Sequence, residues 1–169
     1  MYTILVTQDN ELRTTVRERI MQRSKNVDSL HFLVDQFYND LDMSEFIVRM
    51  EIRHINMQEP RSELLTLSTE LYKDKLEYKI PVDTWLTKHA GDVEVQLSFT
   101  KKDLDEYGNE IQHVRRTSPT IIHIVPLSAW SNFVTDEALN ALDSAFLQLE
   151  GYMKQMEETI EQMGSQDRK

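Results

Sequence analysis

The sequence predicts a mainly β protein that ends in an α-helix: an antiparallel β-sandwich followed by a coiled-coil helix. Two observations lead to this prediction. Apolar and polar residues alternate in short segments of the first 130 residues, which is the period of strands with one buried face. From about residue 135 the apolar residues recur every three or four positions, which is the period of a helix. We therefore expect a sandwich over 1–130, a coiled-coil helix over 131–163 and a polar tail over 164–169.

Residues 92–100 carry the clearest strand pattern. Its apolar members are Val93, Val95, Leu97 and Phe99, and polar residues separate them. Residues 46–53 repeat the alternation with Phe46, Val48, Met50 and Ile52. Successive side chains of a strand point to opposite faces, so both segments predict strands with one buried and one solvated face. Residues 121–125 are apolar at nearly every position, which predicts a central strand covered on both faces.

Turn residues separate the remaining strand candidates. These candidates are residues 2–7, 12–21, 30–34, 64–67, 76–80 and 112–116. Gly108 and Asn109 favour a hairpin at 107–110, because both residue types tolerate positive φ. Asp83 is a suitable cap for a short helical turn at 81–86. A single sheet would leave one apolar face in water, so we expect two packed sheets.

The predicted helix carries a strict heptad repeat. Thr135 is the expected N-cap, and the apolar positions that follow alternate at spacings of three and four. These positions, called the helix seam below, are Leu139, Leu142, Phe146, Leu149, Met153, Met156, Ile160 and Met163. A strict 3.5-residue period predicts a left-handed supercoil with partner helices. The alternative is one helix packed on the sandwich, although such a helix usually shows a wider apolar stripe.

The seam indicates oligomerisation without fixing the number of helices. Phe146 and Met153 occupy a positions, and these residue types follow no simple rule for the number of helices in a coiled coil. The e and g positions hold only acidic or neutral residues, so opposite-charge pairs between these positions are not available to select a partner. Association must then come from burial of the seam. We expect a homo-oligomer of this chain, and specifically a trimer.

Composition excludes several classes of protein. The 169 residues are 40% apolar and 28% charged, which suits a packed domain rather than a disordered chain. The absence of cysteine excludes disulfides, thiolate nucleophiles and cysteine-ligated metals. A net charge of −10 argues against nucleic acid as a partner. The sequence shows neither a secretory signal pattern nor an apolar run long enough to cross a membrane, so we expect no membrane partner.

Motifs that carry chemistry are scarce. The four glycines form neither a phosphate-binding loop nor a nucleophile elbow, and we expect no catalytic residues, no cofactor and no metal site. His113 and His123 would face each other if their strands formed a hairpin, but the sequence indicates no further zinc ligands. Residues 103–110 resemble a calcium loop superficially, and an acidic hairpin tip fits their spacing better.

Two tryptophans and a group of arginines are the candidates for contact with partners. Trp85 and Trp130 are candidate ligand contacts, because an exposed indole can stack on a sugar ring; packing in a core or an interface is the alternative. The basic residues are Arg13, Arg17, Arg19, Arg23, Arg115 and Arg116. A nucleic-acid contact or a merely solvated face would also place arginines in this way. We favour electrostatic docking on an acidic protein partner.

Several segments resemble a known group of proteins. These segments are Arg19–Asp28, Leu64–Leu67, Leu71–Lys73, Leu76–Pro81 and Val114–Thr120. Together with the order of sandwich and coil, they resemble virion structural proteins of phages that infect Gram-positive bacteria. The pattern is similar to the N-terminal domain of baseplate upper proteins and of related tail-fibre and head-fibre proteins. The resemblance implies a sandwich that attaches to the particle and a helical coil that leads outward to a receptor-binding part.

The resemblance and the helix seam together predict a phage virion structural protein with a role in viral assembly or host attachment. Its expected partners are other copies of itself and other virion proteins, and its expected location is the virion, after synthesis in the bacterial host cytoplasm. Few residues follow the predicted coil, so we expect an adaptor, plug or short fibre. The alternative is a carbohydrate-binding or host-receptor-binding module that uses Trp85 or Trp130. A hydrolase whose site forms only in three dimensions is a third hypothesis, although we expect no enzyme.

Overall fold

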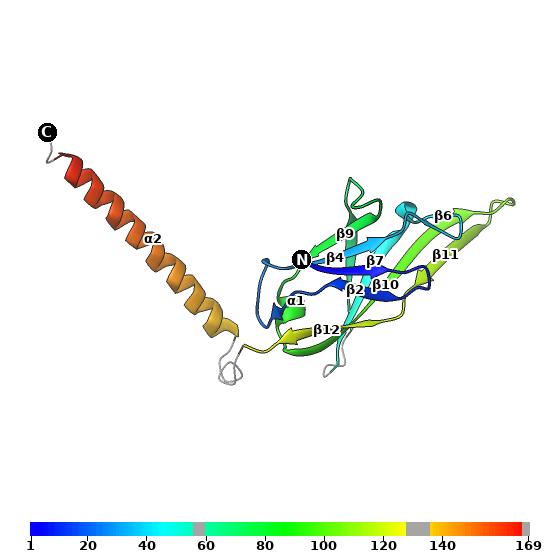
Figure 1. The fold of residues 1–169 in the computed structure, drawn as a ribbon, viewed down its shortest axis with the longest axis horizontal. Coiled ribbons are helices and arrows are strands. Elements are labelled where there is room, and N and C mark those ends of the chain that lie inside the picture. Colours follow the sequence, from blue (N-terminus) through cyan, green and yellow to red (C-terminus); the bar gives the residue numbers. More distant parts are fainter. Residues whose placement is uncertain (56–59, 128–135, 167–169) are drawn as a thin grey trace. The chain divides into compact units, whose positions relative to one another are not determined.

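The strands of the N-terminal unit pair into one curled sheet. The computed structural model describes residues 1–55, 60–127 and 136–166, and the chain divides into two compact units, Met1–Leu127 and Ser128–Lys169. The paired strands of the first unit are β1 (Tyr2–Val6), β2 (Leu12–Val16), β3 (Ile20–Met21), β4 (Ser29–Val34), β7 (Ile47–His54), β8 (Arg61–Leu67), β9 (Leu76–Pro81), β10 (Gly91–Leu104), β11 (Glu110–Arg116) and β12 (Thr120–Val125). In the described residues their order is β2-β1-β4-β9-β8-β7-β10-β12-β3, and β11 pairs with β10 (Figure 1).

Strand β8 is the corner at which the sheet folds over. Its first part, Arg61–Leu65, pairs with β7, and its end, Thr66–Leu67, pairs with β9. One strand thus belongs to both halves of the sheet, and the two halves enclose a shared core. Isoleucine, phenylalanine and tyrosine side chains from β1, β4 and β9 meet valine, leucine and phenylalanine side chains from β7 and β10 in one buried cluster. The predicted sandwich-like β domain followed by a C-terminal helix is therefore confirmed.

Most of the predicted alternation is present. Val93, Val95, Leu97 and Phe99 of β10 are fully buried, and Val48, Met50 and Ile52 of β7 are buried beside them. The ladders are mostly antiparallel. The β1–β4 and β3–β12 ladders are parallel, which local periodicity could not reveal because it does not specify the partner strand.

Two strand predictions were wrong in part. Residues 12–21 form two strands, because β2 pairs with β1 and β3 pairs with β12, at opposite ends of the strand order. Strand β12 is covered on one face only: Ile122 and Ile124 are fully buried, whereas Ile121 is 45% exposed. Its neighbour β3 is only two residues long, so β12 lies close to an edge of the sheet.

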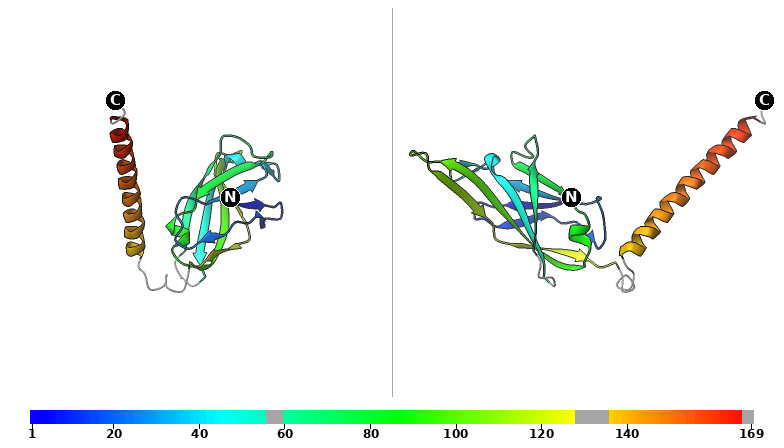
Figure 2. Two further views of the ribbon diagram at one scale, coloured as in Figure 1. Left: turned by 60° about the vertical axis from the view of Figure 1, so that its left-hand side comes forward. Right: turned by 180° about the vertical axis from the view of Figure 1, so that it is seen from behind.

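The two predicted turns are present. A hairpin joins β10 to β11, with Gly108 at φ +79°, and the Asp105 carboxylate accepts hydrogen bonds from the backbone amides of Tyr107 and Asn109 at 2.9 and 2.8 Å. The helical turn is α1 (Thr84–Thr87), and the Asp83 side chain accepts a hydrogen bond from the Thr84 amide at 2.6 Å. Helix α1 lies at the end of the domain opposite the hairpin tip (Figures 1 and 2).

A small hairpin was not predicted. It consists of β5 (Phe37–Tyr38) and β6 (Leu41–Asp42), and a 3-10 turn at Met43–Glu45 follows it. Asp42 caps this turn, and its carboxylate accepts hydrogen bonds from the amide and hydroxyl of Ser44. Met43 is fully buried, so the turn closes part of the core.

The second unit contains helix α2 (Asp136–Gln166). The helix continues past the predicted end at residue 163 and includes part of the predicted polar tail. The predicted N-cap Thr135 and the candidate ligand contact Trp130 lie outside the described residues.

Candidate functional site

The seam of α2 is exposed when the helix is considered by itself. Seven of its eight side chains, from Leu142 to Met163, are between 49% and 67% exposed, and Leu139 is half-buried. Soluble proteins rarely leave a continuous apolar stripe in water, and such stripes mark interaction sites. The predicted oligomerisation residues therefore form one stripe along one helix, with chemistry suited to burial against other helices.

The arginines predicted to dock are not carried by one strand face. Arg13 lies on β2, and its side chain is 68% exposed. Its Nη2 is 4.0 Å from Oε2 of Glu11. Arg17 and Arg19 lie between β2 and β3, where they line a groove of about 540 Å³ together with Ile121 and His123 of β12. Arg23 is half-buried in the turn after β3, and Arg116 is exposed on β11.

Arg115 does not belong to an exposed docking surface, which corrects the sequence-based prediction. Only 8% of the residue is exposed. Its Nε donates a hydrogen bond to Oδ1 of Asn10 at 2.6 Å, and its Nη2 donates to the carbonyl of Thr7 at 3.1 Å. The guanidinium carbon lies 3.7 Å from the centre of the Tyr38 ring, a cation–π contact. Burial lowers the pKa of Arg115, and electrostatic interactions with Tyr38 and Asp35 act in the opposite direction and raise it.

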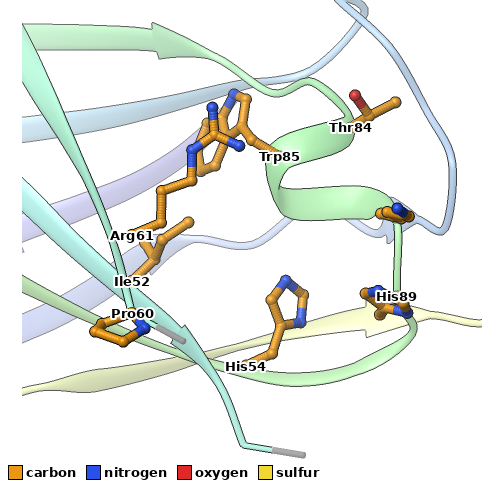
Figure 3. Close-up of a pocket in the computed structure, with 8 residues that line it drawn as sticks. Ile52, His54, Pro60, Arg61, Thr84, Trp85 and His89 are labelled. Atoms are coloured by element: carbon orange, nitrogen blue, oxygen red, sulfur yellow. The ribbon is translucent and has the colours of Figure 1, made fainter. Parts of the chain in front are cut away.

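Trp85 lines a cleft at the end of the β domain that carries α1. The cleft has a volume of about 430 Å³. Its lining residues are Ile52, His54, Pro60, Arg61, Thr84, Trp85, Lys88 and His89 (Figure 3). They come from β7, β8 and the α1 region, so the curl of the sheet brings three distant segments together.

Local structure explains how the cleft side chains are held. Ile52 and Arg61 are direct partners in the β7–β8 ladder and face the same side. Leu86 and Thr87 of α1 are fully buried, and the Thr87 hydroxyl donates a hydrogen bond to the carbonyl of Ser24 at 2.7 Å. With its neighbours fixed in this way, α1 places the half-buried Trp85 ring at the cleft.

Two histidines meet in the same cleft. The rings of His54 and His89 are 5.9 Å apart in an edge-to-face arrangement. Burial lowers the pKa of His54, and the neighbouring His89 lowers it further, against a backbone hydrogen bond with Trp85 that raises it. Sequence reasoning missed His54, Arg61, Lys88 and His89 as a group. The one available signal was the alternation of β7, which places His54 on the same face as Met50 and Ile52.

His113 and His123 do not face each other. Their strands, β11 and β12, each pair with β10 instead. His113 lies opposite Lys101, and its Nε2 is 3.4 Å from Oδ2 of Asp103. His123 lies opposite Asp92, and its Nδ1 is 2.8 Å from Oδ1 of that residue. Within residues 1–55, 60–127 and 136–166, no group of three His, Asp or Glu side chains is arranged to hold a metal ion. Among the same residues, no helix is long and apolar enough to cross a membrane.

The comparison with solved structures gives a weak structural similarity. The chain is similar to a structure described as the "N-terminal domain of phage TP901-1 ORF48", with 18% sequence identity and a TM-score of 0.37. The match covers 75% of this chain and 96% of that one. No protein-family model and no curated protein matches the sequence.

Proposed function

We propose that this chain is a phage virion structural protein, a baseplate, tail-fibre or head-fibre component. In this proposal the β domain docks on the particle and α2 joins identical chains into a trimer. The observation that supports it most is the helix seam, whose spacing suits a coiled coil and whose side chains form an exposed stripe on α2 considered by itself. The segments that resemble phage virion proteins lie in the β domain, where the proposal places the docking function.

Burial of the seam is the driving force for the bundle. An isolated helix is only marginally stable in water, and most helical stability in proteins comes from packing of an apolar face. Full burial of a leucine, isoleucine, phenylalanine or methionine side chain contributes about 1.5–3 kcal/mol. Residues 136–163 hold seven acidic side chains and one lysine, so aligned copies repel each other. Exposed charges interact weakly, at about 1 kcal/mol or less for each pair, so burial of the seam exceeds this repulsion.

Docking is assigned to the exposed basic residues. Arg13, Arg17, Arg19 and Arg116 are exposed on the β domain. In a chain with a net charge of −10, these groups suit an acidic surface of another virion protein. Arg115 is left out of this surface because it is buried.

An antibody against the chain provides the test of the virion assignment. Particles purified through a density gradient should contain the protein in a fixed ratio to the capsid protein after repeated washing. Detection in the lysate but not in the washed particles would contradict a virion role.

Gly151 offers a test of how α2 is solvated in the bundle. It occupies an outer f position of the heptad, and no atom lies within 4 Å of a Cβ added there. Gly151→Ala should stabilise the helix by about 1 kcal/mol per chain, because alanine loses less backbone entropy on ordering. Thermal unfolding followed by helical circular dichroism should show a higher midpoint. A lower midpoint would mean that a partner packs closely against Gly151, contrary to the proposed register.

The cleft beside Trp85 favours a second candidate function, ligand binding by the β domain. Its volume of about 430 Å³ falls in the range of small-molecule sites, and it combines an indole with hydrogen-bonding groups. This supports the carbohydrate-binding alternative at Trp85. The same hypothesis for Trp130 concerns a residue outside the described part of the structure.

A further inference from the structure

We propose that the cleft beside Trp85 binds an acidic saccharide, that is, a sugar ring bearing a carboxylate or phosphate group. This inference rests on the second candidate function, ligand binding, and is independent of the virion assignment. Three features lead to it: the cationic lining of the cleft, the indole beside the cations, and the unused hydrogen-bonding capacity of Arg61.

The described lining of the cleft is positively charged, whereas the protein as a whole has a net negative charge. Arg61 and Lys88 bring two cationic side chains, His54 and His89 bring two imidazoles, and none of the described residues that line the cleft is an aspartate or glutamate. The whole chain has 29 acidic and 19 basic residues, so a cavity whose described lining has only basic ionisable groups departs from the bulk composition. This sign favours an anionic ligand over a neutral or cationic one.

Arg61 is oriented and still has donors to offer. Its Nε donates a hydrogen bond to Oε1 of Glu63 at 2.8 Å, which fixes one edge of the guanidinium. Within the described residues, its two Nη groups have no hydrogen-bond partner. A guanidinium held in this way presents a planar pair of donors, the geometry that binds a carboxylate or phosphate. Lys88 adds a second charge, and no described residue forms an ion pair with it.

Trp85 supplies the surface for the ring. Figure 3 shows the Arg61 side chain pointing from β8 toward α1, where the Trp85 indole lies, with His54 and His89 on the other side of the cleft. Sugar rings pack their C–H faces on indoles, and the Thr84 hydroxyl in the same lining can exchange hydrogen bonds with a sugar hydroxyl. A small inorganic anion would use the cations and leave the indole unused, so the combination favours a saccharide with an acidic substituent.

Fluorescence titration of the full chain tests the proposal. In a Trp130→Phe background, Trp85 is the only tryptophan and reports directly on the cleft. The probes are glucuronate, glucose 1-phosphate, glucose and inorganic phosphate. At least one acidic sugar should bind roughly tenfold more tightly than both glucose and inorganic phosphate. Binding of only one acidic sugar would support the proposal and identify the anionic group.

Three variants separate recognition from folding. Arg61→Gln and Lys88→Gln should each weaken binding of the acidic sugar by roughly tenfold or more. Lys102→Gln removes one positive charge near the β10–β11 hairpin, outside the lining of the cleft, so it should bind as well as the parent. Equal thermal midpoints would show that all the variants are folded.

Three outcomes would overturn the proposal. One is no binding of either acidic sugar at about 20 mM, a concentration that detects even millimolar affinity. The second is equal binding of glucose, which would remove the role of the cations. The third is equal binding of inorganic phosphate, which would remove the role of the indole. None of these outcomes bears on assembly through α2, which is measured by mass.

Discussion

Replacing Leu149 by aspartate is expected to convert the full-length oligomer into a monomer. Leu149 occupies a d position in the middle of the seam and is 55% exposed on α2. In the bundle, its burial contributes about 1.5–3 kcal/mol for each copy. The substitution removes this contribution and brings one carboxylate from each chain to the bundle centre, where burial of an ion costs several kcal/mol. Light scattering at tens of micromolar should give about three times the 20.0 kDa chain mass for the parent and 20.0 kDa for the variant.

Leu147 provides the matched control for this experiment. It lies on the same helix at an outer b position and is 70% exposed. Leu147→Asp introduces the same charge and removes the same side chain, yet it should leave the mass at the parental value, because an outer position stays in water. Equal masses for Leu149→Asp and the parent would contradict oligomerisation through the seam. A monomeric parent would instead favour the single-helix alternative.

Replacing Arg115 by alanine is expected to destabilise the β domain by about 2–4 kcal/mol, because charged hydrogen bonds and a cation–π contact are lost together. The substitution removes the donors to Asn10 and to the Thr7 carbonyl, and it leaves a space beside Tyr38. Urea unfolding followed by tryptophan fluorescence should show a lower midpoint.

Two further substitutions at this place make the result specific. Arg116→Ala removes the same side chain from the next, exposed position of β11 and should change stability by less than about 0.5 kcal/mol. Arg115→Lys keeps the charge and loses the planar guanidinium, so it should fall between the two. If Arg115→Ala and Arg116→Ala unfold at the same urea concentration, Arg115 has no structural role and belongs again to the docking surface.

Local patterns predicted the elements better than their partners. The alternation in β7 and β10 and the turn residues Asp83 and Gly108 each express a preference of a few neighbouring residues, and the structure contains the corresponding strands and turns. The failures concern pairing. Whether residues 12–21 form one strand or two depends on β1 and β12, which are distant in sequence. The exposed face of β12 follows from the shortness of its neighbour β3.

The helix seam and the cleft also differ in how well the sequence alone predicts their residues. The helix seam is a property of one segment, so its eight members could be identified from spacing alone. The cleft combines β7, β8 and α1, and only Trp85 among its residues was a candidate from the sequence. For Arg115 the sequence was misleading, because it adjoins the exposed Arg116. Successive residues of β11 face opposite sides, so the Arg115 side chain lies on the other face, where it contacts Asn10 and Tyr38.

Cysteine cross-linking of the full chain tests most directly whether the seam is buried between copies. The protein has no cysteine, so one introduced thiol reports on one position. In a parallel bundle the Leu149 positions of neighbouring chains meet at the core, whereas Ser144, at an f position, faces away from it. Under mild oxidation at low protein concentration, Leu149→Cys should form one covalent dimer in each trimer and leave the third chain as a monomer, whereas Ser144→Cys should stay monomeric on a denaturing gel. Equal, slow cross-linking at the two positions would contradict the proposed assembly.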